Sequence, residues 1–128
     1  MPAPNHQVTA RRERNGHFYF DVALNGITTH TVFDTGASWV ALRAEDAGRI
    51  GIAVNGLNYS IPVSTANGIS YVAPVMLDTV QVGDIIVHDI VAAVSKPGTQ
   101  NVTLLGQSFM SKLAGYRFED GALILQGH

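Results

Sequence analysis

The sequence predicts an all-β fold: a small closed, barrel-like β structure with a projecting hairpin and one or two short helices. About nine or ten short apolar runs alternate with turn signals along the chain, and close spacing of this kind is typical of small β-barrels and sandwiches. The length of 128 residues, with 46% hydrophobic and 14% charged residues, suits one domain with one core. We therefore expect a single globular unit.

The polar stretch at residues 1–16 is expected to be an N-terminal tail or linker, and ordered structure is expected to begin at residue 17. Apolar and polar side chains alternate through 17–24, which predicts a strand with one buried face. Asn25-Gly26 is the strongest short hairpin signal. Residues 27–33, rich in β-branched side chains, form the expected return strand.

The remaining elements follow from the same signals. Residues 44–50 predict the one clear helix of the first half, with Gly51 as its stop, and 107–113 predict a second short helix. The other apolar runs predict strands at 38–42, on either side of Asn67-Gly68 in 59–77, at 78–82, 85–94, 102–106, 116–118 and 122–126. Pro62 and Pro74 predict that the 59–77 hairpin lies at an edge or projects into solvent.

Composition excludes several functions. The net charge of −2 gives no reason to expect a nucleic-acid partner. The chain has no cysteine, which excludes disulfides and thiolate metal sites. The five histidines are dispersed without the spacing of a zinc motif, and no apolar run approaches the roughly 20 residues of a membrane helix. We expect neither a metal nor another cofactor.

One carboxylate stands out. Asp34 follows the apolar pair Val32-Phe33 and opens Asp-Thr-Gly-Ala, so a short loop between two apolar strands fixes its position. A plain turn is the simple alternative, since Asp, Thr and Gly all favour turns. About seventy residues later, Leu104-Leu105-Gly106 repeats the pattern of an apolar pair followed by glycine, and a hairpin with a glycine tip lies between the two.

These features in this order resemble the retropepsin-like aspartic proteases. The resemblance covers about residues 17–126 and rests on Asp34–Ala37, the hairpin tip Thr65–Gly68 and the segment 104–109. In the bacterial members these segments read DTGA, TANG and LLG-x-SF. The resemblance implies a protease domain at residues 17–128 with the fold of one acid-protease lobe, a peptide or protein substrate and an aspartic endopeptidase activity.

The chemistry of such a protease needs two carboxylates about 3 Å apart that share one proton. The nearest second triplet, Asp78-Thr79-Val80, has valine in place of glycine and no apolar pair before it. The second aspartate is therefore expected from another copy, as Asp34 of a homodimer with one self-complementary two-fold interface.

The resemblance implies roles for further residues. Thr35 would bond across the dimer, Gly36 would allow close backbone approach, and Gly106 would let its strand pass near the Asp34 loop. The hairpin tip, composed of Thr65, Ala66, Asn67 and Gly68, would be a flap that covers substrate. Trp39 is a candidate for a substrate subsite or for core or dimer packing.

The chain departs from the family at three positions. Many viral members have an Asp–Arg ion pair where this chain has Ser38 and Gln107, so we expect a neutral hydrogen bond in its place. Ala37 lacks the hydroxyl that bonds to a catalytic carboxylate in two-lobed relatives. Since such a bond favours the charged carboxylate, its loss predicts a mildly acidic to near-neutral optimum.

Two other functions stay open on the sequence. The first is a catalytically silent dimerisation or peptide-binding module, because fold does not fix function. The second is a monomeric β-barrel carrier with Asp34 in a turn. The resemblance implies a periplasmic or inner-membrane-associated protein if an N-terminal anchor has been removed, and a cytoplasmic one otherwise. Residues 1–16 are then a linker or a self-cleaved segment.

Overall fold

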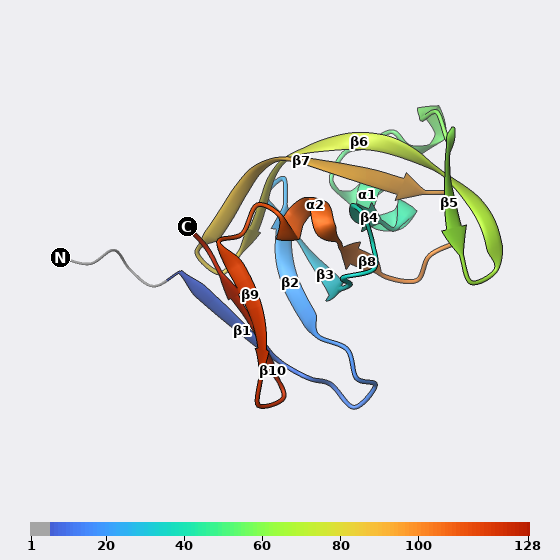
Figure 1. The fold of residues 1–128 in the computed structure, drawn as a ribbon. Helices are drawn as coiled ribbons and strands as arrows, with labels where there is room; N and C mark the ends of the chain where they lie inside the picture. Colours follow the sequence, from blue (N-terminus) through green and yellow to red (C-terminus); the bar gives the residue numbers. More distant parts are fainter. Residues whose placement is uncertain (1–5) are drawn as a thin grey trace.

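The structure, a computed structural model, describes residues 6–128 (Figure 1). Ten strands, two short α-helices and one 3-10 helix follow each other along the described chain, which confirms the all-β prediction with its two short helices. The strands are β1 (Gln7–Arg11), β2 (Tyr19–Leu24), β3 (Ile27–Phe33), β4 (Val40–Leu42), β5 (Ile61–Thr65), β6 (Gly68–Val82), β7 (Ile85–Ser95), β8 (Thr103–Leu105), β9 (Gly115–Glu119) and β10 (Ala122–Gln126); the helices are α1 (Ala44–Arg49), η1 (Val54–Gly56) and α2 (Gln107–Met110).

Six strands close into a barrel. Their hydrogen-bonded order is β2-β3-β8-β4-β7-β6, and β6 returns to pair with β2 through Ala23↔Gln81 and Leu24↔Val80. Closure leaves these six strands without a free edge of their own along the paired barrel wall. β5 adds to the outer side of β6 and makes the edge hairpin. The closed barrel expected from the sequence is confirmed.

Apolar and polar side chains alternate along the strands, and the apolar ones form the core. In β2 the side chains of Phe20, Val22 and Leu24 are buried while Asp21 is exposed. Each such apolar side chain contributes about 1.5–3 kcal/mol when buried. Asn25 and Gly26 have φ of 47° and 85°, as the predicted type I′ turn requires.

β6 corrects one expected boundary. The sequence predicted separate strands at 59–77 and 78–82, but β6 runs unbroken for 15 residues, paired with β7. The polar Asp78 that suggested a break is accommodated because the Oδ1 of Asn25 accepts its backbone N–H at 2.8 Å. Pro74 is tolerated because it lies between the stretches of β6 paired with β5 and with β2.

The N-terminal expectation also needs correction. Ordered structure begins before residue 17: β1 pairs antiparallel with β10 from Gln7↔Gln126 to Arg11↔Ala122. Together with β9 they form a second sheet in the order β1-β10-β9. The sequence does not predict β1, because its outward residues are polar and only Val8 and Ala10 pack on the core. Residues 1–5 of the expected tail lie outside the described residues, and the proposed domain boundary remains a prediction.

The two α-helices are short, and both contribute side chains to the core: Ala47 from α1, and Phe109 and Met110 from α2. Gly51, with φ of 95°, ends the turn after α1, as the sequence predicted. Across residues 6–128 every helix falls short of the length and apolarity needed to cross a bilayer.

Candidate active site

Asp34 lies at the end of β3, at the entrance to the loop of residues 34–39 that leads to β4. The side chain is half-buried. Its Oδ1 accepts the backbone N–H of Gly36 at 2.9 Å, which orients the carboxylate from within its own turn. A Cβ at position 36 would lie 3.3 Å from that same oxygen, so glycine leaves room beside the carboxylate.

The loop encloses Gly106. A Cβ at position 106 would lie 2.1 Å from the carbonyl oxygen of Trp39 and 2.6 Å from that of Ala37. Both are backbone atoms that cannot turn aside. Only glycine therefore lets the end of β8 pass this close to the Asp34 loop. The sequence-predicted pair of segments, Asp34–Ala37 and Leu104–Gly106, comes together in space.

Parallel pairing brings the two segments together. β8 lies between β3 and β4, parallel to β3 through Val32↔Leu104 and Phe33↔Leu105. The N–H of Asp34 then donates to the carbonyl of Leu105 at 3.0 Å. The apolar pairs that precede Asp34 and Gly106 in the sequence are thus neighbouring rungs of the barrel.

The start of α2 holds the loop from the other side. The N–H of Gln107 donates to the carbonyl of Ala37 at 2.8 Å, and the N–H of Ser108 to that of Ser38 at 3.0 Å. The side-chain Nε2 of Gln107 donates to the carbonyl of Thr35 at 2.9 Å. A neutral bond is indeed present at Gln107, but its acceptor is the Thr35 backbone rather than the Ser38 side chain.

Ser108 is a support that the sequence reasoning missed. Its Oγ accepts the N–H of Val40 at 2.9 Å and donates to the carbonyl of Val91 at 2.7 Å. One hydroxyl thus joins β4, β7 and α2 beneath the loop. Nothing local in the stretch L-L-G-Q-S-F-M marks this serine, because its partners on β4 and β7 lie elsewhere in the chain.

A buried carboxylate anchors the opposite end of β8, and it too was missed. Asp46 of α1, with 4% of its surface exposed, accepts Thr103 Oγ1 at 2.7 Å and Arg43 Nη2 at 3.1 Å. Arg49 Nη1 adds a contact of 3.3 Å. Burial is the largest effect on the pKa of Asp46 and raises it, but the hydrogen bonds and charge of these donors together outweigh burial and hold the pKa below its ordinary value.

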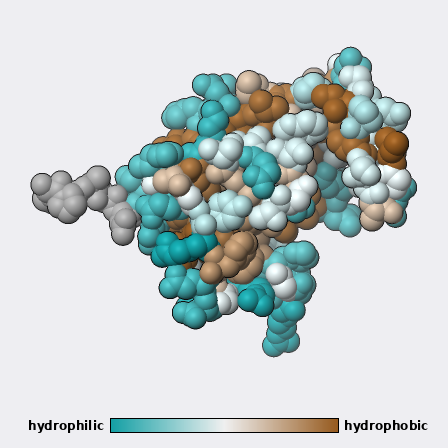
Figure 2. Space-filling view, viewed as in Figure 1, coloured by the Kyte–Doolittle hydropathy of each residue, from teal (hydrophilic) through white to brown (hydrophobic). Residues whose placement is uncertain are grey.

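The expected flap residues form the tip of the β5–β6 hairpin. Thr65 pairs with Gly68, and Thr65 Oγ1 donates to the carbonyl of Gly68 at 2.6 Å. Gly68 has φ of 104°, a conformation that favours glycine. In Figure 1 this hairpin projects from the barrel well apart from the Asp34 loop. Figure 2 shows apolar side chains at the surface on this side of the molecule. Within the hairpin, Ile69 is 70% exposed.

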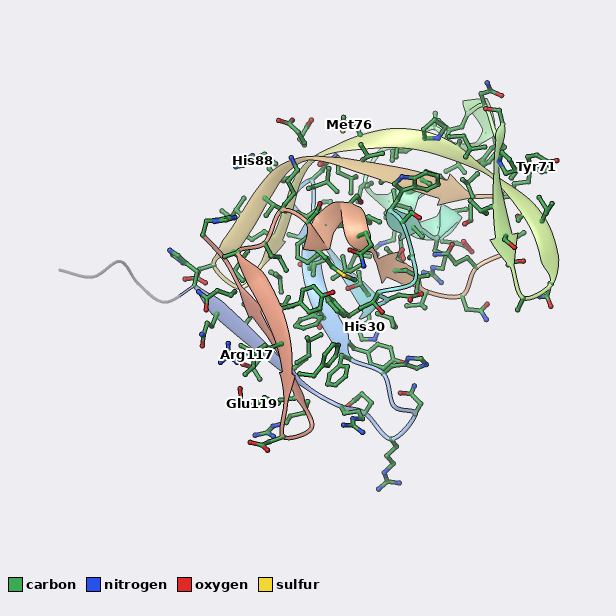
Figure 3. The ribbon with its side chains drawn as sticks, viewed as in Figure 1. His30, Tyr71, Met76, His88, Arg117 and Glu119 are labelled. Atoms are coloured by element: carbon green, nitrogen blue, oxygen red, sulfur yellow. The ribbon has the colours of Figure 1, made fainter. Side chains whose placement is uncertain are left out.

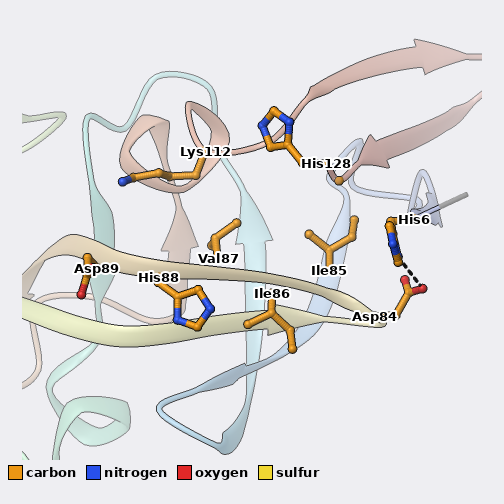
Figure 4. A pocket seen from close by; sticks show the side chains of 10 residues that line it. His6, Asp84, Ile85, Ile86, Val87, His88, Asp89, Lys112 and His128 are labelled. Atoms are coloured by element: carbon orange, nitrogen blue, oxygen red, sulfur yellow. Dashed lines mark hydrogen bonds and ion pairs between the residues drawn. The ribbon is translucent and has the colours of Figure 1, made fainter. Parts of the chain in front are cut away.

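Two surface hollows lie away from Asp34. One, of about 460 Å³, lies beside the β6–β7 turn (Figure 4), and the other, of about 360 Å³, lies beside β1 and β2. In the first hollow His6 Nδ1 lies 2.8 Å from Asp84 Oδ2. Within residues 6–128 no three His, Cys, Asp or Glu side chains gather as metal ligands would. Asp34 lines neither of these two hollows.

Comparison with known families gives a match over most of the chain. The family described as "gag-polyprotein putative aspartyl protease" matches residues 20–112. The matched region begins in β2 and ends after α2, so it contains the Asp34 loop, the β5–β6 hairpin and β8.

Two curated relatives are uncharacterised bacterial proteins. One, encoded in the cobV 5′ region of a Sinorhizobium species, is 40% identical over 84% of this chain and 46% of its own length. The other, from Rickettsia prowazekii (strain Madrid E), is 34% identical over 93% of this chain and 51% of its own length. The chain therefore spans about half the length of these relatives.

Solved structures share the fold. A retropepsin-like aspartic protease from Rickettsia conorii superposes with a TM-score of 0.87 at 32% identity, covering 99% of this chain and 97% of that one. EIAV protease, solved with an inhibitor, superposes with a TM-score of 0.60 at 16% identity, covering 79% of this chain and 91% of that one. The second likeness is one of fold alone, and both identify the barrel with its hairpin as retropepsin-like.

Proposed function

Because the chain belongs to the retropepsin-like family of gag-polyprotein aspartyl proteases, we propose that it is an aspartic endopeptidase with Asp34 as its catalytic carboxylate. The observation that carries the proposal is the Asp34 loop itself. A half-buried carboxylate follows a barrel strand and is oriented by the N–H of Gly36. The strand that ends at Gly106 fixes the loop from behind through backbone contacts.

The proposed mechanism uses two copies of Asp34, one from each subunit of a homodimer. Two carboxylates at close range cannot both ionise, so they hold one proton between them. The charged carboxylate takes a proton from a water molecule as that water attacks the peptide carbonyl carbon. The protonated carboxylate donates to the carbonyl oxygen, and the resulting diol intermediate collapses with proton transfer to the amine. In this proposal one protomer supplies half of the site, and its partner supplies the other half.

The neighbouring residues take supporting roles in this proposal. Thr35, exposed at the tip of the loop, bonds across the dimer. Gly36 allows close approach of backbone to substrate, and Ala37 and Ser38 continue the loop that cradles Gly106. Trp39, half-buried after the loop, borders a substrate subsite.

The β5–β6 hairpin is the proposed flap. Its edge strand β5 has one side free for main-chain bonds to an extended peptide, and closure over the peptide excludes water from the reaction. We assign the chain to the bacterial type of the family, with residues 34–37, 65–68 and 104–109 as its signature. The bacterial origin of the relatives supports this assignment.

The decisive experiment removes the carboxylate without changing its size. Asp34→Asn should abolish cleavage of a peptide library, by about 10³-fold or more, because the amide cannot accept a proton from water. The matched control is Asp78→Asn, the same change in the Asp-Thr-Val triplet, which should cleave like the wild type. Dimer content measured in parallel separates loss of chemistry from loss of assembly. Full cleavage by Asp34→Asn would exclude this mechanism and favour a binding module.

The pH profile tests the role of Ala37. Because no hydroxyl follows the triplet to bond to the charged dyad, we expect cleavage to be fastest at mildly acidic to near-neutral pH. Replacing Ala37 with Ser or Thr should move the optimum toward lower pH, measured as the rate of peptide hydrolysis between pH 3 and 8. A wild-type maximum below about pH 3, near the lower pepsin dyad value, contradicts the expectation.

A further inference from the structure

Asparagine is followed by glycine at four places in the described chain. The pairs are Asn15-Gly16, Asn25-Gly26, Asn55-Gly56 and Asn67-Gly68, and all four asparagines are exposed. An asparagine in this context deamidates readily, because glycine has no side chain to hinder the attack of its backbone nitrogen on the asparagine amide. The four dipeptides share the same chemistry, so their surroundings in the fold decide which of them reacts.

Hydrogen bonds hold the side chains of the first two asparagines. Asn15 Nδ2 donates to Tyr19 Oη at 2.7 Å, and Asn15 Oδ1 accepts the N–H of His17 at 3.0 Å. Asn25 Oδ1 accepts two backbone N–H groups of β6, at 2.8 and 3.2 Å. Each amide would have to break these bonds before its carbon could turn toward the nitrogen of the next residue. Both pairs are therefore protected.

The third pair is protected at the attacking nitrogen instead. Asn55 lies in η1, where the N–H of Gly56 donates to the carbonyl of Ala53 at 3.0 Å. The glycine nitrogen must lose its proton to attack, and this hydrogen bond holds the proton within the helical turn. Reaction at Asn55 therefore requires η1 to open first.

The fourth pair lies at the tip of the β5–β6 hairpin. Among the described residues the side-chain amide of Asn67 has no hydrogen-bond partner, and only its backbone N–H bonds to a side chain, Thr65 Oγ1, at 3.2 Å. Around the Cβ direction of Gly68 nothing lies within 4 Å. The amide can therefore turn toward the Gly68 nitrogen without losing a hydrogen bond or meeting another group.

The hairpin also gives this tip little support. Residues 68–71 pair with β5 alone, because the pairing of β6 with β7 ends at Val72. In Figure 3 the hairpin, which carries Tyr71, extends away from the barrel. Local opening costs least free energy at exposed ends of this kind, so the backbone of Asn67 can reach the geometry of attack.

We propose that Asn67 is a site of spontaneous deamidation, which converts the hairpin tip into an acidic form with time. The nitrogen of Gly68 bonds to Cγ of Asn67, the Cγ–Nδ2 bond breaks, and ammonia leaves with the proton of the Gly68 nitrogen. Water then opens the five-membered succinimide ring at either carbonyl, which gives aspartate or isoaspartate. No oxidant, reductant or further reactant is needed. One added negative charge moves the formal net charge from −2 to −3.

Both products change the tip. Thr65 and Gly68 form the last pair of the β5–β6 ladder, and Thr65 Oγ1 donates to the carbonyl of Gly68 at 2.6 Å. Isoaspartate carries the main chain through its side chain and adds one methylene, so the turn no longer closes at this pair. Either product places a charge in a segment, 59–77, that has none. We expect lower cleavage activity, a consequence that rests on the proposed function because it treats this hairpin as the flap.

Peptide mapping by mass spectrometry measures the modification at each asparagine while the folded protein is held at mildly alkaline pH. Asn67 should gain about 1 Da, at least about tenfold faster than the other three asparagines of the Asn-Gly pairs. In urea, where the hydrogen bonds of the fold are absent, the four pairs should react at similar rates. Ion exchange should resolve the added charge in the folded sample.

Two variants carry the same change at different pairs. Asn67→Gln should remove the modification at the tip, since attack on a glutamine amide must close a larger ring. Asn55→Gln should leave the rate at Asn67 unchanged. Each aged protein is then compared with its own fresh sample in cleavage of a peptide library. Wild type and Asn55→Gln should lose activity in proportion to the modified fraction, whereas Asn67→Gln should retain its own starting activity.

The possible outcomes separate this inference from the proposed function. Modification at Asn67 ahead of the other three pairs supports the inference even if no fresh sample cleaves peptide, a result that would count against the protease alone. Equal rates at the four pairs in the folded protein, or faster reaction at Asn55, overturn the inference. Undiminished cleavage by protein in which Asn67 has been converted overturns the expected effect on the flap.

Discussion

At the scale of single residues, position 106 illustrates how the site depends on an absent atom. A methyl group there would meet two backbone carbonyls at 2.1 and 2.6 Å, far inside contact distance. Gly106→Ala should therefore destabilise the fold by about 3 kcal/mol, the upper part of the range for overpacking, and reduce peptide cleavage further by displacing the Asp34 loop. Urea unfolding followed by tryptophan fluorescence measures the first effect, since Trp39 lies in that loop.

The control for this change is Gly56→Ala. Position 56 has open space around its Cβ direction and no positive φ, so the variant should unfold within about 0.5 kcal/mol of the wild type. Equal free energies of unfolding for the two variants would show that the backbone around Gly106 can move to accept a methyl group.

The places of residues in the fold could be predicted where the signal is local. Asp34 and Gly106 each follow an apolar pair in the sequence, and each carries its own evidence. Ser108 and Asp46 carry none, because their partners lie far along the chain: Val40 is 68 residues from Ser108, and Thr103 is 57 residues from Asp46. When two hydrogen-bond partners lie far apart in the sequence, only the fold shows which hydroxyl or carboxylate binds which group.

At the scale of elements, the contact of α1 with β8 makes stability depend on acid. The pKa of Asp46 is below its ordinary value in the folded protein, so the ionised carboxylate stabilises the fold above about pH 4. This contribution is lost as pH falls through the folded-state pKa. Asp46→Asn should cost about 1–3 kcal/mol near neutral pH, and the difference from wild type should shrink below about pH 4.

Denaturant unfolding at pH 7, 5 and 3 measures this change. Glu45→Gln, on the exposed side of the same helix, should unfold like the wild type throughout. A constant gap between Asp46→Asn and wild type across this range would contradict the linkage. Cleavage assays below about pH 4 must then be read beside stability, since loss of rate there combines dyad titration with weakening of the α1 anchor.

Element boundaries could be predicted where both strands of a pair have a clear local pattern of apolar alternation and turn residues. The Asn25-Gly26 hairpin, α1 and the β9–β10 hairpin were expected near their observed positions. β1 was not, because its pairing partner β10 lies at the far end of the chain and its alternation is weakly apolar. The sequence predicts a break within β6 because Asp78 is charged. The structure shows no break there, since Asn25, 53 residues away, accepts the backbone N–H of Asp78.

At the scale of the whole molecule, the proposed active site shared by two copies predicts that the rate of cleavage depends on dilution. Well below the dimer dissociation constant, tenfold dilution should lower specific activity by about tenfold, because dimer concentration falls with the square of protein concentration. Progress curves over a dilution series, beside sedimentation, measure this dependence. Specific activity that stays constant for a species sedimenting as a monomer contradicts a shared site.

Mixing supplies the control for dilution. Excess Asp34→Asn protein should suppress the wild type by capturing its subunits in mixed dimers with one carboxylate.

The 15-residue length of β6 has a mechanical consequence for the β5–β6 hairpin, the proposed flap. β7 supports β6 as far as the pair Val72↔Ser95, and beyond it residues 68–71 are backed by β5 alone. The hairpin is thus fixed to the barrel at one end, and its tip extends beyond the strands of the barrel. We expect the hairpin to bend most at this fixed end. The tip then moves about Val72 while the hydrogen bonds between β5 and β6 stay intact. If this hairpin is the flap that we propose, the stiffness of the chain around Val72, rather than the chemistry of the tip, sets how far it opens.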